Sequence, residues 1–197
     1  MTKLLNDQGM DLLFRQARTH NGWQQKPVTE VTLRALHDLM RLPPTSMNCS
    51  PARVIFVTTD AARARLIPAL SEGNQAKTRA APVTAIIGQD LEFWRKLPEL
   101  FPHNQNAGKS FSANKPKADE TAFRNASLQG AYLILAARAL GLDCGPMSGF
   151  DAEMVNDAFF AGTTVRVNFL CNLGYGDAAA LRPRGPRPDF DDVCSII

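Results

Sequence analysis

The chain has 197 residues, of which 45% are hydrophobic and 21% are charged, and its formal net charge is +3. This length supports one substantial core and is short for two independent domains, so we predict a single domain over residues 1–197. The mild, scattered positive charge argues against a nucleic-acid partner, and no run approaches the ~20 apolar residues that cross a membrane.

The N-terminus and the cysteines indicate the compartment. The first residues mix charged with apolar side chains and lack the apolar core of a signal peptide, which favours a cytoplasmic protein. The four cysteines lie far apart and have no C-x-x-C spacing. We therefore predict free thiols, with neither a disulfide nor a zinc site, at Cys49, Cys144, Cys171 and Cys194.

The first predicted elements are helical. Apolar residues between Leu4 and Phe14 indicate one helix or two short ones. Thr29 is a suitable N-cap for a helix over residues 30–41, which the Pro43-Pro44 pair would end.

The middle of the chain alternates strands and helices. We predict strands at 53–58 and 83–88, with a helix near 61–71 and a polar turn at Ser71–Asn74 between them. Residues 91–118 are the least regular stretch and carry four aromatic residues among prolines, asparagines and lysines. We predict either an arm that covers a site or a partner, or a surface loop whose own aromatic side chains pack it against the protein.

The segment 120–140 is apolar on nearly all sides, which predicts a largely buried helix. Its seam of small residues permits close helix approach and fits a central helix shared with a second subunit, which Gly141 would terminate. Gly145–Phe150 is predicted as a loop, followed by a helix from Asp151 and a last strand over 165–173.

The ionisable residues single out no catalytic group. There is no G-x-S-x-G elbow, and the three histidines have no metal-ligand spacing, so no metal site is predicted. Gly174–Ala179 matches a dinucleotide-binding pattern, but only residues 180–197 follow, and three prolines forbid the helix that such a unit needs. If the chain is an enzyme, a cofactor supplies the chemistry.

A proline-bounded turn at residues 43–51 offers hydroxyl, amide and backbone N–H groups in one place. Such a turn can hold an oxygen-rich, partly anionic ligand, or it can be a plain connection between helix and strand.

Together and in order, five segments resemble the flavin-dependent nitroreductase superfamily over essentially the whole chain. They are Arg18-Thr19-x-Asn21, the Pro44–Asn48 loop, Asn74 with Lys77, Gly145–Gly149, and Arg182 with Arg184. Within that superfamily, residues 17–23, 44–53 and 145–151 are similar to the malonic semialdehyde reductase branch of bacterial pyrimidine degradation. The resemblance implies an α+β fold with a central, mostly antiparallel sheet flanked by helices, in a domain-entwined homodimer whose active sites lie at the interface.

The resemblance also implies an FMN cofactor, with NADH or NADPH as reductant. The residues that would bind the FMN phosphate and ribityl end are Arg18, Thr19, Asn21, Arg182 and Arg184. The partner subunit would contribute Pro44, Thr45, Ser46 and Asn48. Asn74 and Lys77 would contact the ribityl chain and the pyrimidine edge, and one face of the ring would be covered by Pro146, Met147, Ser148 and Gly149, with a backbone N–H toward N5.

The implied activity is hydride transfer from NAD(P)H through flavin N5 to a small acceptor, with no catalytic side chain. Malonic semialdehyde, reduced to 3-hydroxypropionate, is the first expectation. Arg124 or a lysine from 109–117 would meet the substrate carboxylate, although Arg124 can equally be a solvated or interface-pairing charge. The alternatives are a broad nitro or quinone reductase and a non-catalytic flavin-binding dimer.

Overall fold

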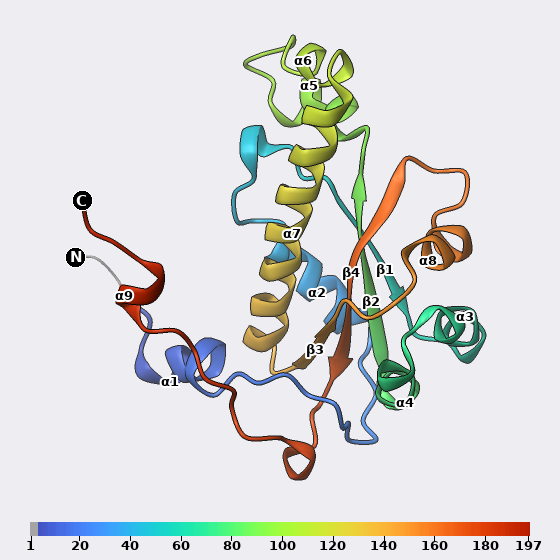
Figure 1. Ribbon diagram of the computed structural model, residues 1–197, viewed down its shortest axis with the longest axis vertical. Coiled ribbons are helices and arrows are strands. Elements are labelled where there is room, and N and C mark those ends of the chain that lie inside the picture. Colours follow the sequence, from blue (N-terminus) through green and yellow to red (C-terminus); the bar gives the residue numbers. More distant parts are fainter. Residues whose placement is uncertain (1–3) are drawn as a thin grey trace.

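The computed structural model describes residues 4–197 and shows a four-stranded antiparallel sheet between two layers of helices (Figure 1). The strands are β1 (Ala52–Val57), β2 (Val83–Asp90), β3 (Asp143–Met147) and β4 (Val165–Gly174), in the order β1-β2-β4-β3. The α+β architecture expected from the sequence is confirmed.

One of the helices is much longer than the others. This helix, α7, spans Lys115–Ala139. The others are α1 (Asp7–Met10), which continues as a π-helical turn (Asp11–Arg15), α2 (Glu30–Met40), α3 (Asp60–Leu66), α4 (Glu72–Ala80), α5 (Leu97–Leu100), α6 (Lys109–Ser112), α8 (Ala152–Phe159) and α9 (Phe190–Val193).

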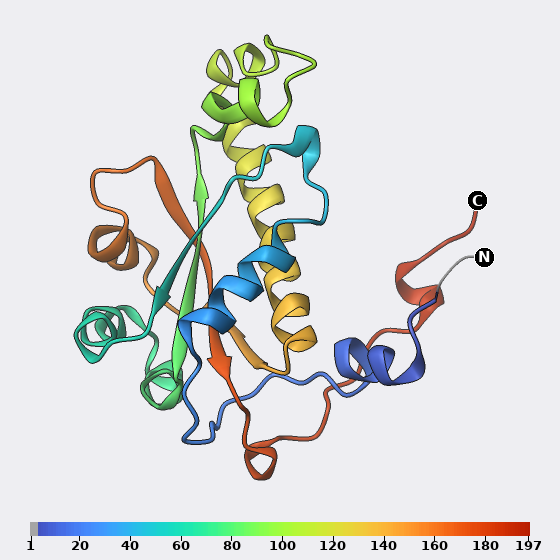
Figure 2. The ribbon, with the colours of Figure 1, turned by 180° about the vertical axis from the view of Figure 1, so that it is seen from behind.

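Each face of the sheet has its own apolar core. Helices α2 and α7 cover one face, where Leu36 and Leu133 pack against Ile87 of β2. Helices α3 and α8 cover the other face, where Leu66 and Val155 pack against the inner strands (Figure 2). The central strands β2 and β4 are therefore buried on both sides, and the ends of the sheet remain available for a site.

Several helices begin or end at the capping residues predicted from the sequence. The Thr29 hydroxyl accepts from the Thr32 N–H at 3.2 Å, and the Asp151 carboxylate accepts from the Met154 N–H at 3.0 Å. Gly141 follows the C-terminal end of α7 with a φ of 78°, a conformation that favours glycine.

Several boundaries differ from the sequence prediction. The helix expected near 61–71 ends at Leu66 and is followed by a 3-10 turn over Ile67–Ala69. The polar turn expected at Ser71–Asn74 is wrong, because α4 already begins at Glu72. The loop expected at Gly145–Phe150 is also wrong for its first half, because Gly145 and Pro146 belong to β3. A proline is tolerated there since β3 lies at the edge of the sheet, beside β4.

Residues 91–118 fold back on themselves instead of extending. Helices α5 and α6 and a 3-10 turn (Phe93–Lys96) enclose a small third core at the N-terminal end of α7. Phe93 is fully buried, and its ring meets that of Phe111 edge-on at 5.1 Å between centroids.

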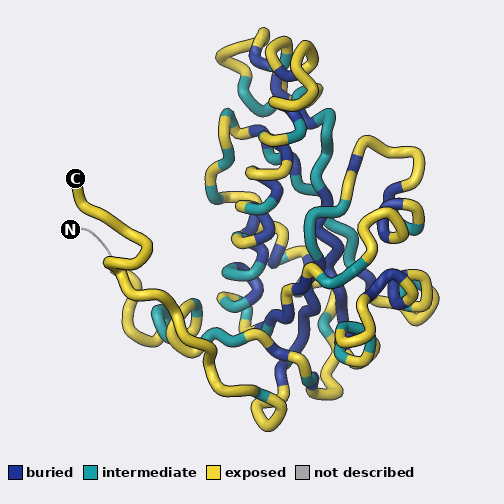
Figure 3. Tube along the Cα trace, viewed as in Figure 1, coloured by how far each residue is buried: buried dark blue, intermediate teal, exposed yellow. Residues whose placement is uncertain are grey.

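The two terminal segments lie side by side away from the sheet, and most of their residues are exposed (Figure 3). Within residues 4–197, no helix combines the length and apolar character needed to cross a bilayer.

Candidate functional site

Five arginines from distant parts of the chain surround one pocket. The pocket has a volume of about 340 Å³ and lies where the segment after α1, the end of α7 and the segment after β4 meet. We call it the arginine pocket; its charged lining is Arg18, Arg138, Arg182, Arg184 and Arg187. Thr19, Asn21 and Pro146 add a hydroxyl, an amide and part of the wall. Guanidinium groups in this number suit an anion with several oxygens, such as a phosphate.

Two of these arginines also fasten the terminal segments to each other. Arg184 donates through Nη2 to the carbonyl oxygens of Arg15, at 2.7 Å, and Ala17, at 2.9 Å. In return, Arg18 donates to the carbonyl oxygen of Arg182. The structure thus brings together all five residues that the resemblance assigns to the phosphate end, although the two groups are more than 160 positions apart in sequence.

A buried charge cluster forms the floor behind this pocket. Asp143, at the start of β3, pairs with the Arg138 guanidinium and accepts from the Gly176 N–H at 2.8 Å. His20 Nε2 lies 3.3 Å from Asp143 Oδ1. Sequence patterns do not single out these three side chains, because their pairing depends on contacts between residues far apart in the chain.

The environment of His20 disfavours its charged form. Burial lowers the pKa of this imidazole below its usual 6.5, and the positive charges of Arg138 and Arg18 lower it further, whereas Asp143 and Asp177 oppose the shift. His20 Nδ1 is buried and has no hydrogen-bond partner among the described residues. The neutral form with its proton on Nε2, facing the carboxylate, satisfies this arrangement best.

A second polar group lies on α4, beside the pocket. Asn74 donates through Nδ2 to the Gly149 carbonyl oxygen at 2.7 Å, so the predicted Asn74 and Gly145–Gly149 elements are adjacent. Burial lowers the pKa of Lys77, and the nearby positive charge of Arg182 adds to that effect. Lys77 therefore lies within electrostatic range of Arg182, which lines the arginine pocket. The Met147 side chain is buried in the core, while Ser148 is exposed.

The predicted loop at residues 44–48 lies elsewhere along α7 and does not line the arginine pocket of its own chain. The Pro44 carbonyl accepts from the Tyr132 hydroxyl at 3.0 Å, and the Ser46 N–H donates to Asn125 Oδ1 at 2.8 Å. Met47 and Asn48 have φ values of 53° and 51°, which bulky residues rarely adopt. Tertiary contacts with α7 hold this loop in a strained shape.

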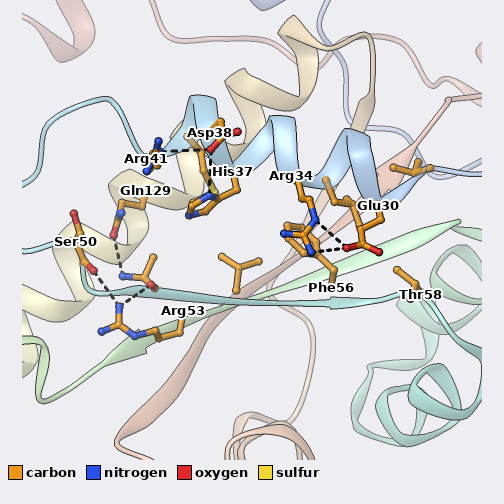
Figure 4. A pocket seen from close by; sticks show the side chains of 15 residues that line it. Glu30, Arg34, His37, Asp38, Arg41, Ser50, Arg53, Phe56, Thr58 and Gln129 are labelled. Carbon is orange, nitrogen blue, oxygen red and sulfur yellow. Dashed lines mark hydrogen bonds and ion pairs between the residues drawn. The ribbon is translucent and has the colours of Figure 1, made fainter.

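A second hollow, larger than the arginine pocket, contains none of the predicted cofactor residues. It is a groove of about 1050 Å³ between α2 and β1 (Figure 4). Its charged side chains are mostly paired with one another, as in Glu30 with Arg34 and Asp38 with Arg41. Arg124, the predicted substrate residue, does not line it; this side chain is exposed on α7 and pairs with Glu120.

No group of three or more metal-ligating side chains occurs in the described part of the chain. The cysteines Cys49, Cys144 and Cys171 are buried free thiols, and Cys194 is an exposed one.

Comparison with known proteins identifies relatives over the whole length. The profile described as "Nitroreductase family" matches residues 15–175. A Burkholderia lata protein with the provisional name NADH dehydrogenase/NAD(P)H nitroreductase is 62% identical over 192 residues, which is 98% of either chain. Among solved structures, the nitroreductase ydfN of Bacillus subtilis has a TM-score of 0.86 at 20% identity, covering 98% of this chain and 100% of that one. A nitroreductase from Exiguobacterium sibiricum, solved in complex with FMN, has a TM-score of 0.85 at 16% identity, with both chains fully covered.

The buried, neutral His20 predicts a loss of stability in acid. Because its folded-state pKa lies below the unfolded value, its contribution is fully present above about pH 6.5 and is lost as the pH falls through the folded-state pKa. Thermal unfolding should show a smaller drop in midpoint between pH 7 and pH 5 for His20→Phe than for the unchanged protein. His37→Phe, at an exposed histidine, is the matched control and should keep the original drop. An equal drop in all three proteins would contradict the assignment.

Proposed function

The chain belongs to the nitroreductase family, and we propose that it is an FMN-dependent NAD(P)H oxidoreductase acting as a single flavin-binding domain. The observation that carries the proposal is the convergence of Arg18, Thr19 and Asn21 with Arg182 and Arg184 around one pocket. A structural neighbour solved with FMN and a relative of 62% identity named as an NAD(P)H nitroreductase support the same cofactor and reductant.

The residues present fit a flavin phosphate. The arginine pocket offers forked guanidinium donors, a hydroxyl and an amide, which is a donor set for a phosphomonoester. In this proposal Arg18 and Arg184 bind the phosphate oxygens, and Thr19 and Asn21 complete the anion site. Lys77, beside Arg182, then lies in the direction in which the rest of the cofactor continues.

At the ring end, backbone groups are available at close range. A Cβ on Gly149 would lie 2.7 Å from Asn74 Nδ2, so only glycine allows Asn74 this approach. The Gly149 carbonyl accepts from Asn74 and from the Ser71 N–H at 3.0 Å, which fixes the orientation of the peptide. We assign Pro146–Gly149 to one face of the ring, and Lys77 to its pyrimidine edge, where a cation stabilises negative charge.

When bound, FMN supplies a two-electron centre that accepts hydride from NAD(P)H and delivers it to an acceptor. The protein's part is to bind, orient and shield that centre.

We further propose that the active form is a homodimer. Helices α2 and α7 expose large apolar side chains that a monomer leaves in water, among them Val31, Leu39 and Phe123. The groove between α2 and β1 continues this face. In the dimer, Thr45, Ser46 and Asn48 serve the flavin of the partner subunit, which accounts for their separation from the arginine pocket of their own chain.

For the acceptor we propose malonic semialdehyde, on the strength of residues 17–23, 44–53 and 145–151. Arg124 is exposed and pairs with Glu120. On substrate binding, its guanidinium would leave Glu120 and pair with the substrate carboxylate. A broad nitro or quinone reductase is the second candidate, favoured by the name of the Burkholderia lata relative.

Reconstitution with FMN tests the cofactor assignment. The protein should turn yellow, and anaerobic NADH or NADPH should bleach its flavin absorbance. Arg18→Gln and Arg184→Gln should each weaken FMN binding about tenfold or more, because each removes a charge-assisted contact to phosphate. Arg95→Gln, which breaks an exposed pair with Glu92, should leave the affinity unchanged. A colourless protein that takes up no flavin would refute the proposal.

Sedimentation velocity tests the dimer. Phe123→Asp places a charge on the exposed face of α7, and we expect a monomer that sediments without flavin. Met154→Asp, at a similarly exposed site on α8 across the sheet, should remain dimeric. A monomer that retains a full complement of FMN would contradict the shared site.

Acceptor kinetics separate the two substrate proposals. Arg124→Gln should raise KM for malonic semialdehyde about tenfold and leave KM for an uncharged quinone unchanged, because only the former carries a carboxylate. If the unchanged enzyme reduces nitroaromatics and quinones but not the aldehyde, the broad reductase is the correct function.

A further inference from the structure

His20 is the one described residue with a buried side-chain nitrogen that lacks a hydrogen-bond partner. The residue is 6% exposed and lies between Thr19 and Asn21, two residues of the arginine pocket. Its side chain points away from that pocket, toward Asp143 and Gly176. The mechanism proposed above gives this imidazole no role.

The backbone of the same residue joins the segment to the sheet. The His20 N–H donates to the Cys144 carbonyl at 2.9 Å, and Thr19 forms a parallel bridge with Cys144. A Cβ on Gly145 would lie 2.6 Å from the His20 carbonyl oxygen. The segment therefore runs along the free edge of β3 at a distance that only glycine permits.

The imidazole connects this segment to the charge cluster through a side chain. Asp143 holds three groups: the Arg138 guanidinium, the Gly176 N–H and the His20 ring. A Cβ on Gly176 would overlap the His20 ring, so the chain after β4 also closes directly over it. Trp23 contributes the remaining wall, with ring centroids 6.3 Å apart.

Through these contacts, His20 holds the two chain segments that form opposite sides of the arginine pocket. His20 is flanked by the Arg18–Asn21 side chains on one segment and packed under Gly176, which leads to Arg182 and Arg184, on the other. Rotating or displacing the imidazole would shift the two groups of donors relative to each other. A phosphate held by several forked donors is sensitive to such a shift, because each contact depends on direction.

We propose that His20 is a positioning residue for the phosphate end of the cofactor site, acting through Asp143 to hold the two arginine-bearing segments in register. The inference rests on the proposed flavin function. It adds that His20 affects the affinity for the FMN phosphate and does not affect the affinity for the flavin ring. Asp143 and Arg138 are the other members of this positioning unit.

The ratio of the dissociation constants for riboflavin and FMN tests this distinction, because riboflavin lacks only the phosphate. Both are measured by fluorescence titration of the apoprotein. His20→Phe keeps an aromatic side chain but removes the Nε2 group that lies 3.3 Å from Asp143. It should weaken FMN binding about tenfold while changing riboflavin binding by less than about threefold. His20→Gln, which retains a donor, should restore most of the FMN affinity.

Gly149→Ala is the matched control at the ring end. Its added Cβ meets Asn74 Nδ2 at 2.7 Å, so it should weaken both flavins alike and leave the ratio unchanged. If His20→Phe does not fold, His20→Asn replaces it, since asparagine is too short to reach the carboxylate.

Equal weakening of FMN and riboflavin by His20→Phe would reduce His20 to a general structural role and overturn the inference. Unchanged affinities for both flavins would overturn it as well. Failure of the unchanged protein to bind either flavin would instead refute the proposed function, and the inference with it.

Discussion

The candidate site depends on one constraint: two segments at opposite ends of the chain must meet beside the edge strand β3. The parts of these segments that carry the arginines, residues 16–22 and 181–187, lie outside the helices and strands and outside the main core. Arg184 and Arg18 fasten them through backbone carbonyls, and Asp143 fastens both to the sheet through His20 and Gly176. Without these polar contacts the fold would keep its core and lose its pocket.

The electrostatics of the pocket follow from the same contacts. Arg18, Arg138 and Arg182 place several positive charges in a small volume. Together with burial, this positive charge lowers the pKa of both His20 and Lys77. Asp143 balances only part of it. An anion in the pocket would relieve the repulsion among the guanidinium groups, so the site gains stability when it is filled. This arrangement is expected of a protein that holds a phosphate-bearing cofactor and is less suited to a transient neutral ligand.

Much of the fold could be predicted from the sequence because its signals are local. The cap at Thr29, the glycine at Gly141 and the alternation of β4 each lie within a few residues of the element they define. The strand β3 was missed because Gly145-Pro146 has the composition of a turn, and its pairing partner lies far along the chain. The His20–Asp143 contact was missed for the same reason. The residues of the arginine pocket were named through a family resemblance, since nothing in their spacing brings positions 18 and 184 together.

A crystal structure of the protein with FMN tests the central claim most directly. We expect the phosphate oxygens within hydrogen-bond distance of Arg18 and Arg184, the pyrimidine edge at Lys77, and the loop with Ser46 of the partner subunit beside the same cofactor. A phosphate bound anywhere else, for example in the groove between α2 and β1, would contradict the account.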